Sequence, residues 1–583
     1  MLPLTQNALT VLKSRYLLRD EKGKIAETPE GLFHRVARHV ASAEILFNKK
    51  ADSIFWEKRY YSLMSDLLFL PNSPTLMNAG TAMNQLSACF VLPVDDSIES
   101  IFETLKDTAL IQKSGGGTGF NFSNIRPKND YVVNTGGDAS GPVSFMKIFD
   151  AATENIKQGG KRRGANMGIL NVTHPDIEEF VLSKAEGEIL NNFNISVGVS
   201  DKFMRAVKNN SEWKLIHQDT GKIAKKIKAK KLWNLIIQNA WKTGDPGLIF
   251  LDTINKTNPT PVIGKIECTN PCGEVPLLPY EPCNLGSINL SLMVKKGKID
   301  WKLLEETIYT SVRFLDNIIE INNYMLPQIK SMAKGNRKIG LGVMGWAEML
   351  IKLEIPYASD YAIFLAEKLM EFINAKSKEA SSELSKERGI FPNWRKSIFY
   401  SNQPLRNATR TSIAPTGTIS IIANTSSSIE PLFALALSRK NVLKNQTLSE
   451  VNEFFVSYLK KKNLFSAEII RHVQKEGTIS RFTSVTQEVK ELFRTAHEID
   501  YNWHIRHQIA FQKHTDNAVS KTINLPNNAT IEDVERAYFS AWRLKAKGIT
   551  IYREGSKSSQ VLNKGISVKN DIHRTPTCKI CSD

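Results

Sequence analysis

The chain has 583 residues, of which 42% are hydrophobic and 23% charged, a composition that excludes a disordered protein and predicts an ordinary globular one. Its apolar runs are all shorter than the roughly 18–20 residues of a transmembrane helix. The net charge of +18, from 77 basic and 59 acidic residues, suits anionic ligands. The densest lysine runs, 222–231 and 459–463, are not interleaved with aromatic residues, which disfavours a nucleic-acid interface.

Six cysteines are too few for a disulfide-stabilised scaffold in a chain of this length. The N-terminus lacks the basic start and apolar stretch of a secretory signal, so we expect a cytoplasmic, reducing environment and no membrane association. Cysteines in that setting are more often catalytic, metal-binding or inert than cross-linked.

Residues 1–70 are predicted to be mainly helical. The segments 31–48 and 53–70 repeat apolar residues at spacings of three and four, the pattern of helices with one buried face. Pro71 and Pro74 are expected to end this pattern.

Short strand-like segments then alternate with helical ones, at 85–94, 97–114, 191–200 and 201–210. Asp95, Asp96 and Ser97 are candidate caps at the start of the first of these helices, since such side chains accept hydrogen bonds from helix N-terminal amides. The alternation of strands and helices predicts an α/β core.

The sequence Asn-Pro-Cys-Gly-Glu at 270–274 is the first candidate for chemistry. Pro271 and Gly273 predict a tight loop. Its tip could present Cys272 in a confined site, with Glu274 as acid and base and Asn270 as a hydrogen-bonding group. The alternative is an ordinary turn around a buried cysteine, and the pentapeptide alone favours that alternative.

Cys89 and Cys283 each precede a strand-like segment and lie far apart in the chain. As a facing pair they could supply two electrons and become a disulfide. Two unrelated buried cysteines are an equally good interpretation at this point. Cys268 could be a packed small hydrophobe.

Three glycine-containing segments could approach anions, at 114–120, 159–165 and 414–420. The first matches neither a Walker A loop nor a dinucleotide fingerprint, and a helix C-cap followed by a turn is favoured. The second is a flexible basic loop that could sense a nucleotide, although plain surface is favoured. The third would bind phosphate if it feeds a helix N-terminus, or would simply form the entry of that helix.

Possible metal ligands are His504, His507 and His514 in one predicted helix, and Cys578 and Cys581 in a polar C-terminal segment. The histidines lie near one helix face, but no glutamate completes a zinc-protease pattern, so a packed helix is favoured. The two cysteines could be a redox dithiol or, with His573, part of a zinc site. A closed zinc site needs four ligands, so we favour the redox dithiol.

Together these segments resemble the large catalytic subunit of ribonucleotide reductase, or its single-chain form, over about residues 69–556. The motifs that carry the resemblance are NSPTLMNAG at 72–80, SAC at 87–89, NPCGE at 270–274, CNLGSINL at 283–290 and APTGTIS at 414–420. The resemblance implies a ten-stranded α/β barrel of two five-stranded halves, with Cys272 on a central finger loop. It divides the chain into an N-terminal helical region at 1–70, a catalytic barrel at 71–555 and a flexible C-terminal redox tail at 556–583.

The family's catalytic roles would fall on matching residues. Cys272 is similar to the cysteine that carries a thiyl radical and takes the 3′ hydrogen of the ribose. Glu274 resembles the base for the 3′ hydroxyl, and Asn270 would hold the substrate hydroxyls.

The resemblance also assigns the reducing equivalents. Cys89 and Cys283 would reduce the 2′ carbon after water leaves and end as a disulfide. Cys578 and Cys581 would exchange with that disulfide and pass it to a thioredoxin- or glutaredoxin-like partner.

Binding residues are implied in the same way. Substrate contacts would come from Ser73, Ala88, Cys89, Gly117, Asn270, Pro271, Cys272, Gly273, Glu274, Pro415, Thr416, Gly417, Thr418 and Ile419. A dNTP or ATP specificity effector would be bound by Asp96, Ser97, Ile98 and Arg126, and the loop 159–168 would relay its signal to the substrate.

The C-terminal part resembles the adenosylcobalamin-dependent class II enzymes. Where enzymes fed by a separate metal-containing subunit have two adjacent tyrosines, the segment 547–556 has one, Tyr552. No glycyl-radical segment ends the chain. We therefore expect adenosylcobalamin as cofactor. The family resemblance also leads us to expect ribonucleoside diphosphates as substrates, a homodimer, and neither metal ligands nor direct nucleic-acid contact. A class I catalytic subunit that needs a radical-generating partner is the alternative.

Overall fold

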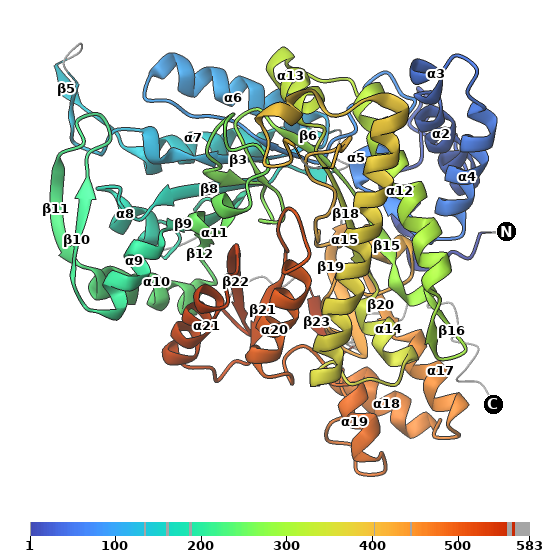
Figure 1. Cartoon of the computed structure of the whole chain (residues 1–583). Helices are drawn as coiled ribbons and strands as arrows, with labels where there is room; N and C mark the ends of the chain where they lie inside the picture. The colour runs from blue at the N-terminus through green and yellow to red at the C-terminus, as the bar shows by residue number, and fades with distance from the viewer. Residues whose placement is uncertain are drawn as a thin grey trace.

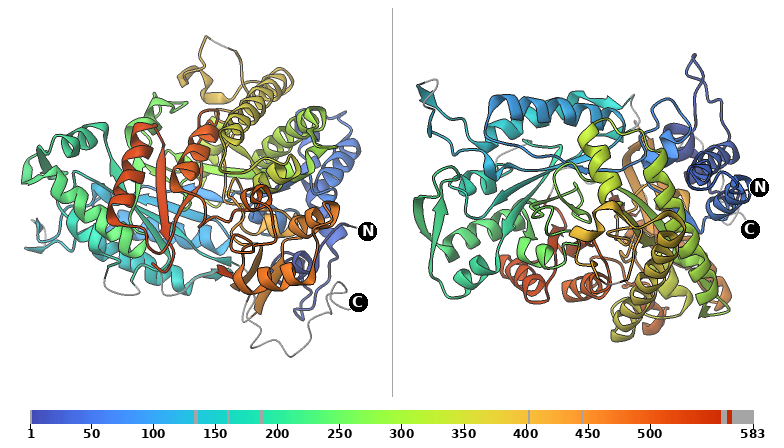
Figure 2. Two further views of the ribbon diagram at one scale, coloured as in Figure 1. Left: turned by 90° about the horizontal axis from the view of Figure 1, so that it is seen from below. Right: turned by 45° about the horizontal axis from the view of Figure 1, so that its top comes forward.

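The computed structural model describes residues 2–132, 136–158, 162–185, 189–401, 403–443, 446–556 and 562–565. N-terminal helices form one end of the molecule, a ten-stranded mixed sheet forms its centre, and helices with the ribbon β10–β11 (Glu212–Ile216 and Ile223–Lys228) form the opposite end (Figures 1 and 2). The expected α/β class is confirmed.

Four helices make up the N-terminal region: α1 (Gln6–Arg15), α2 (Pro29–Ala41), α3 (Glu44–Phe47) and α4 (Ser53–Ser65). The apolar faces of α2 and α4 are buried in one core with α12 (Trp301–Ile321) and α15 (Asp360–Arg388), as their residue spacing predicts. The side chain of Thr28 caps α2 by accepting a hydrogen bond from the backbone N–H of Gly31 at 3.0 Å.

The helical pattern ends earlier than the sequence predicts. Helix α4 stops at Ser65, Leu67 takes a left-handed conformation with φ of 55°, and the chain continues into β1 (Phe69–Pro71). Pro74 does not end a helix but lies in the first turn of α5 (Ser73–Asn78), where a missing N–H breaks no intrahelical bond. The error arose because a short buried strand and a buried helix segment share a continuous apolar run.

The central sheet contains β1 and nine more strands, within the described ranges: β2 (Cys89–Val91), β3 (Gly117–Asn121), β8 (Asn166–Asn171), β9 (Phe193–Val199), β12 (Gly247–Phe250), β15 (Pro282–Asn289), β18 (Ile339–Met344), β21 (Thr522–Leu525) and β22 (Gly548–Arg553). Strands β2, β3, β8, β9 and β12 are parallel neighbours in that order. The parallel pairs β15–β18 and β21–β22 join this group through antiparallel contacts, β2 with β15 and β12 with β22.

Two isolated parallel bridges extend this pairing. Leu341 of β18 pairs with Thr411, and Ile413 pairs with Val519, which precedes β21. Strand pairing therefore continues from β18 through residues 411–413 to the segment before β21, the strand at the other end of the sheet order. A barrel of two parallel halves requires pairing in this direction.

Within the described residues, the barrel and its surroundings also contain α12, α15 and fourteen further helices: α6 (Ile98–Lys113), α7 (Pro142–Asn155), α8 (Ile177–Leu182), α9 (Asp201–Lys208), α10 (Ala229–Thr243), α11 (Leu251–Lys256), α13 (Pro327–Asn336), α14 (Trp346–Lys352), α16 (Ile419–Ile422), α17 (Glu453–Lys461), α18 (Ala467–Glu476), α19 (Gln487–Leu492), α20 (Tyr501–Gln512) and α21 (Ile531–Arg543). None of the helices described is long and apolar enough to cross a membrane.

Smaller strands form ribbons outside the central sheet: β4 (Tyr131–Val132) with β5 (Gly137–Asp138), β6 (Lys157–Gln158) with β7 (Arg162–Arg163), β13 (Cys268–Thr269) with β14 (Pro276–Leu277), and β16 (Val294–Lys295) with β17 (Lys298–Ile299). A three-stranded sheet is formed by β19 (Ala436–Leu443), β20 (Gln446–Val451) and β23 (Leu562–Lys564).

Several predicted elements of the barrel are confirmed. The helices predicted at 97–114 and 201–210 are α6 and α9, and the strand predicted at 191–200 is β9. Ser97 is the N-cap of α6, because its hydroxyl accepts a hydrogen bond from the backbone N–H of Ser100 at 3.1 Å. The strand predicted at 85–94 is limited to the three residues of β2.

A buried cluster of charges connects the N-terminal helices to the barrel. Asp316 of α12 is fully buried and forms ion pairs with Arg337, Arg388 and Arg406, while Arg388 also pairs with Glu44 of α3 at 2.8 Å. Burial alone would raise the pKa of Asp316, but the three guanidinium groups hold it far below its usual range. The cluster fixes α3 and α12 against each other through charged rather than apolar contacts.

Candidate active site

The segment 270–274 forms the tip of the hairpin β13–β14. The side-chain oxygen of Asn270 accepts a hydrogen bond from the backbone N–H of Val275 at 2.9 Å, and the N–H of Gly273 donates to the carbonyl of Asn270 at 3.1 Å. Gly273 has a φ of +81°, a conformation that a side chain would strain. The proline and glycine thus form the tight loop that the sequence predicts, with Cys272 between them.

This hairpin packs directly on strand β3, and the glycines of β3 make the approach possible. A Cβ added at Gly117 would lie 2.9 Å from the ring of Pro271, and one at Gly119 would lie 1.9 Å from the carbonyl oxygen of Thr269. The glycine-rich segment 114–120 therefore begins with the end of α6 and a turn, as the sequence favours. Its last glycines, Gly117 and Gly119, belong instead to strand β3, on which the finger loop packs.

A cavity of about 210 Å³ lies beside the loop tip. Four residues of proposed chemical role line it: Cys89, Asn270, Cys272 and Glu274. The proposed substrate contacts Ser73, Ala88, Gly117, Pro271, Pro415, Thr416, Gly417, Thr418 and Ile419 line it as well. Residues distant in the sequence are thus brought together around one space.

Cys89 and Cys283 are direct partners in the antiparallel register of β2 and β15. Such partners have Cα atoms about 4.5–5.5 Å apart, within the roughly 4.4–6.8 Å that a disulfide spans. Both are present as thiols. Of the two interpretations open from the sequence, the facing pair is the one the geometry favours.

The two thiols of the pair have different surroundings. Cys89 lines the cavity, and its sulfur accepts a hydrogen bond from the side-chain amide of Asn270 at 3.2 Å. Cys283 is fully buried, and burial raises the pKa of its thiol far above the usual range, an effect that Lys338 opposes. A thiol whose pKa is raised stays protonated at neutral pH, so Cys283 could donate a hydrogen.

Glu274 is almost completely buried, yet it lines the small cavity. Its backbone carbonyl accepts hydrogen bonds from the hydroxyl of Ser412 and the N–H of Ala518, both at 2.9 Å. These contacts fix the C-terminal side of the finger loop to the segments that carry the isolated bridges.

Arg15 and Tyr16, at the end of α1, also line the small cavity. The hydroxyl groups of Tyr16 and Ser73 hydrogen-bond at 2.7 Å. An arginine at this position suits an anionic group of a ligand. Neither residue was expected from the sequence, because both lie at the end of a helix outside the recognised motifs.

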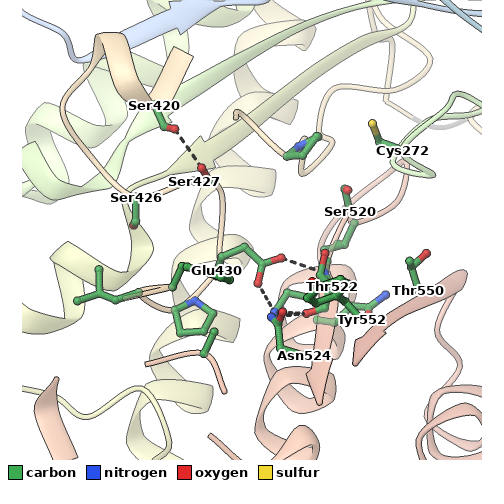
Figure 3. Close-up of a pocket in the computed structure, with 18 of the residues that line it drawn as sticks. Cys272, Ser420, Ser426, Ser427, Glu430, Ser520, Thr522, Asn524, Thr550 and Tyr552 are labelled. Atoms are coloured by element: carbon green, nitrogen blue, oxygen red, sulfur yellow. Dashed lines mark hydrogen bonds and ion pairs between the residues drawn. The ribbon is translucent and has the colours of Figure 1, made fainter. Parts of the chain in front are cut away.

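A second cavity of about 670 Å³ shares Pro271, Cys272 and Pro415 with the first. The side chain of Cys272 is exposed, and Figure 3 shows its sulfur at the edge of this larger space. Polar residues of the wall include Glu430, Ser520, Thr522, Asn524, Thr550 and Tyr552. Cys272 is therefore neither a buried turn cysteine nor stranded on the outer surface, but the point where two cavities meet.

The larger cavity has an acidic lining. Asp245, Glu348, Glu430, Glu450 and Glu453 line it, and Lys521 is the one lysine or arginine among its described lining residues. Such a wall offers acceptors to hydroxyl and amide donors and disfavours highly anionic ligands.

The residues proposed for the effector lie elsewhere. Asp96 and Arg126 form an ion pair at 2.6 Å, and the backbone N–H of Arg126 donates to the same carboxylate at 3.0 Å. Ser97 caps α6, and Ile98 is 58% exposed. None of these four residues lines either of the two cavities described.

The remaining candidates are only partly visible. Cys578 and Cys581 lie outside the described residues, and so do residues 159–161 of the proposed relay loop, whose last residues belong to β8. His504 and His507 are buried and hydrogen-bond the carbonyls of Ala496 and Tyr357. No group of three potential ligands converges on a metal position in the part of the chain that the structure describes.

Comparison with known proteins gives consistent matches over almost the whole chain. The family model for the ribonucleotide reductase all-alpha domain matches residues 2–84, and that for the ribonucleotide reductase barrel domain matches residues 87–403 and 399–552. A vitamin B12-dependent ribonucleoside-diphosphate reductase of Thermoplasma acidophilum is 52% identical, over 97% of this chain and 81% of its own. One of Mycobacterium tuberculosis is 49% identical, over 96% and 81%.

A solved structure shares the fold. The class Id ribonucleotide reductase alpha subunit of Actinobacillus ureae aligns with a TM-score of 0.77 and 25% sequence identity, covering 95% of this chain and 97% of that chain. Family models that match most of the chain, and relatives about half identical to it, lead to one conclusion: the chain belongs to the ribonucleotide reductase family.

Proposed function

We propose that this chain reduces ribonucleoside diphosphates to 2′-deoxyribonucleoside diphosphates with adenosylcobalamin as cofactor and a dithiol as reductant. The observation that carries the proposal is the position of Cys272 between two cavities, one of which also holds Cys89, Asn270 and Glu274. Two relatives about half identical to this chain are named vitamin B12-dependent ribonucleoside-diphosphate reductases.

In the proposed reaction, the Cys272 thiyl takes the 3′ hydrogen of the ribose, and Glu274 accepts the proton of the 3′ hydroxyl. Loss of the 2′ hydroxyl as water leaves a carbon that must gain two electrons. Cys89 and Cys283 supply these two electrons and two protons, one proton to the departing water and one to the 2′ carbon, and become a disulfide. Cys272 then returns the 3′ hydrogen, and Glu274 returns the proton to the 3′ oxygen. Asn270, which bonds the sulfur of Cys89, orients the hydroxyl groups next to that thiol.

The substrate's diphosphate would lie against the loop 415–419 and Arg15. Backbone amides near the start of α16 and one guanidinium offer donors to phosphate oxygens there. Thr416 fixes this loop to the segment around Ser428, because its hydroxyl accepts a hydrogen bond from the backbone N–H of Ser428 at 2.7 Å.

Adenosylcobalamin, when bound, supplies the one-electron oxidation that a thiol cannot generate by itself. The larger cavity fits such a group for two reasons. It reaches Cys272, and its carboxylate, hydroxyl and amide side chains can accept hydrogen bonds from a ligand rich in amide and hydroxyl groups. Glu430, Ser520, Thr522, Asn524 and Tyr552 would hold it.

The class I alternative is not favoured. A chain fed by a separate subunit would need a relay of redox-active side chains, and the segment 547–556 offers only Tyr552, which lines the cavity beside Cys272. The named relatives also favour cobalamin dependence.

The proposal includes regulation and partners. Asp96, Ser97, Ile98 and Arg126 would bind a dNTP or ATP effector, and the exposed apolar side chains Phe102 and Leu110 of α6 and Ile148 of α7 would be covered by a second copy in a homodimer. Cys578 and Cys581 would exchange with the Cys89–Cys283 disulfide and pass it to a thioredoxin- or glutaredoxin-like protein in the cytoplasm. The division into 1–70, 71–555 and 556–583 belongs to the same proposal.

Anaerobic incubation of the purified chain with a ribonucleoside diphosphate, a small dithiol and adenosylcobalamin tests the function. We expect deoxynucleotide to form without any second subunit, and no product from Cys272→Ser. Product that appears only after a separate metal-containing subunit is added would support class I instead. Full activity of Cys272→Ser would refute the radical chemistry.

A further inference from the structure

An ion pair lies in the wall of the larger cavity, between Glu430 and Lys521 (Figure 3 shows Glu430 with its neighbours). The side chain of Lys521 is completely buried. Its ammonium contacts three acceptors: the carboxylate of Glu430, Nδ1 of His504 at 2.9 Å and the carbonyl of Thr522 at 2.7 Å. All three donors of the lysine are therefore used within the protein.

His504 is held as a neutral acceptor in this arrangement. Its Nε2 donates to the carbonyl of Ala496 at 3.0 Å, which leaves Nδ1 to accept from Lys521. Burial, reinforced by the nearby ammonium, lowers the pKa of His504 well below 6.5. The one positive charge of this group therefore faces the carboxylate of Glu430.

Glu430 has acceptor capacity left over. One carboxylate oxygen contacts Lys521, and the other accepts the backbone N–H of Thr522 at 2.9 Å. A carboxylate has about four lone-pair positions, so further donors can bind. Its side chain is one-quarter exposed and lines the cavity, where Figure 3 shows it directed towards Thr522 and Asn524.

The same chain segment connects this carboxylate with the finger loop. The backbone N–H of Ala518 donates to the carbonyl of Glu274, and Lys521 and Thr522, which fix Glu430, follow three and four residues later. Three residues of extended chain span about 10 Å. Ser520 lies between them in the cavity wall (Figure 3). The backbone between the contact with the finger loop and the residues that fix Glu430 therefore spans at most about 10 Å, and Glu430 and Cys272 line the same cavity.

We propose that Glu430, fixed by Lys521, binds the ribose hydroxyls of the cofactor's adenosyl group and so directs that group towards Cys272. The inference rests on the cobalamin dependence proposed above and adds the part of the cofactor that this residue recognises. A carboxylate held by fixed donors is a strong acceptor for a vicinal diol and repels phosphate, so the nucleoside rather than an anionic part of the ligand is placed there. The alternative donors, the amide groups of the corrin, are distinguished by experiment.

The test compares the affinity of the full chain for adenosylcobalamin and for methylcobalamin, which lacks the nucleoside ligand, by equilibrium dialysis in the dark with detection by visible absorption. Replacing Glu430 alone would leave a buried ammonium without its counter-ion, so the variant is Glu430→Gln/Lys521→Met, checked by its thermal unfolding temperature. Glu453→Gln is the matched control, since that carboxylate also lines the cavity but bonds Asn424.

We expect the double variant to bind adenosylcobalamin about 10-fold or more weakly, the range for lost hydrogen bonds to a charged group, and methylcobalamin as wild type does. The control should keep both affinities within about twofold. Equal weakening for both cobalamins, or no weakening, would overturn the inference while leaving the proposed function in place. Failure of the wild-type chain to bind either cobalamin would overturn both.

Discussion

Replacing Gly119 by alanine tests whether the contact between β3 and the finger loop sets the active-site geometry. A Cβ at this position would lie 1.9 Å from the carbonyl oxygen of Thr269, whereas Cβ atoms essentially never come within 3.0 Å of such an atom. The difference is 1.1 Å, and that is the least distance by which strand and loop must separate. Because Thr269 precedes Asn270 directly, the displacement passes into the residues that hold Cys272.

The expected effect on turnover is larger than the effect on stability. Overpacking by one methyl group typically costs about 1–3 kcal/mol, which a chain of this size tolerates. A shift of about 1 Å in reacting groups can reduce the rate about 100-fold. We therefore expect Gly119→Ala to fold, to unfold at a slightly lower temperature, and to lose about two orders of magnitude in deoxynucleotide formation.

Gly137→Ala is the matched control, because an added Cβ there meets nothing within 4 Å and its backbone is not left-handed. It should leave turnover and thermal unfolding unchanged. Turnover of Gly119→Ala within about twofold of wild type would show that the finger loop does not depend on this contact.

Three further predictions follow from other parts of the molecule. Replacing Cys578 and Cys581 by serine should allow about one turnover per chain with a protein reductant, as measured by product formed in quenched samples. A small dithiol should restore further turnovers. Continued turnover with the protein reductant would contradict the proposed role of the two cysteines. Lys338→Met leaves the fully buried Glu281 without its ion-pair partner at 2.6 Å, so we expect urea unfolding to show about 3–5 kcal/mol of destabilisation. The double variant Glu281→Gln/Lys338→Met should be destabilised markedly less. Equal destabilisation of both variants would argue against a stabilising role of the ion pair. Burial lowers the pKa of His507 to about 3, below the roughly 6.5 of an unfolded histidine. Between these values the unfolded state binds more protons, so stability falls as pH falls, by up to about 1.4 kcal/mol per pH unit. Urea midpoints measured from pH 7 to pH 5 should therefore depend less steeply on pH in His507→Gln than in wild type, and an equally steep dependence would refute this assignment.

Local sequence rules predicted the finger loop well and the cysteine pair poorly. Proline fixes its own φ, and glycine tolerates the positive φ that a tight turn needs, whatever surrounds them, so a tight loop follows from the residues themselves. The pairing of Cys89 with Cys283 depends instead on the register of β2 with β15, which distant parts of the chain determine. The residues alone could offer the pair only as one of two interpretations.

The glycines of β3 could have indicated the contact with the finger loop from the sequence, although a turn was favoured there. Glycine within a strand pattern indicates close approach of another backbone, and Gly117 and Gly119 occupy such positions. Their neighbours Gly115 and Gly116 do form a turn, which made a turn the simpler interpretation of the whole run. Arg15 and Tyr16 left no comparable signal, because their role depends on α1 reaching the barrel.

In the proposed reaction, the arrangement of the thiols would let an oxidant and a reductant act in one site. Among the described cysteines, Cys272 alone lines the larger cavity, while Cys89 lines only the smaller one and Cys283 lines neither. In the proposed reaction, an oxidising group in the larger cavity would therefore reach the sulfur that becomes a radical and not the pair that stays reduced. A substrate in the smaller cavity would lie beside both Cys89 and Cys272. In the proposed reaction, the electrons of the Cys89–Cys283 pair would then go to the ribose and not to Cys272. On this reasoning, widening the contact between the cavities should uncouple the chemistry, because the pair would then be oxidised without forming deoxynucleotide.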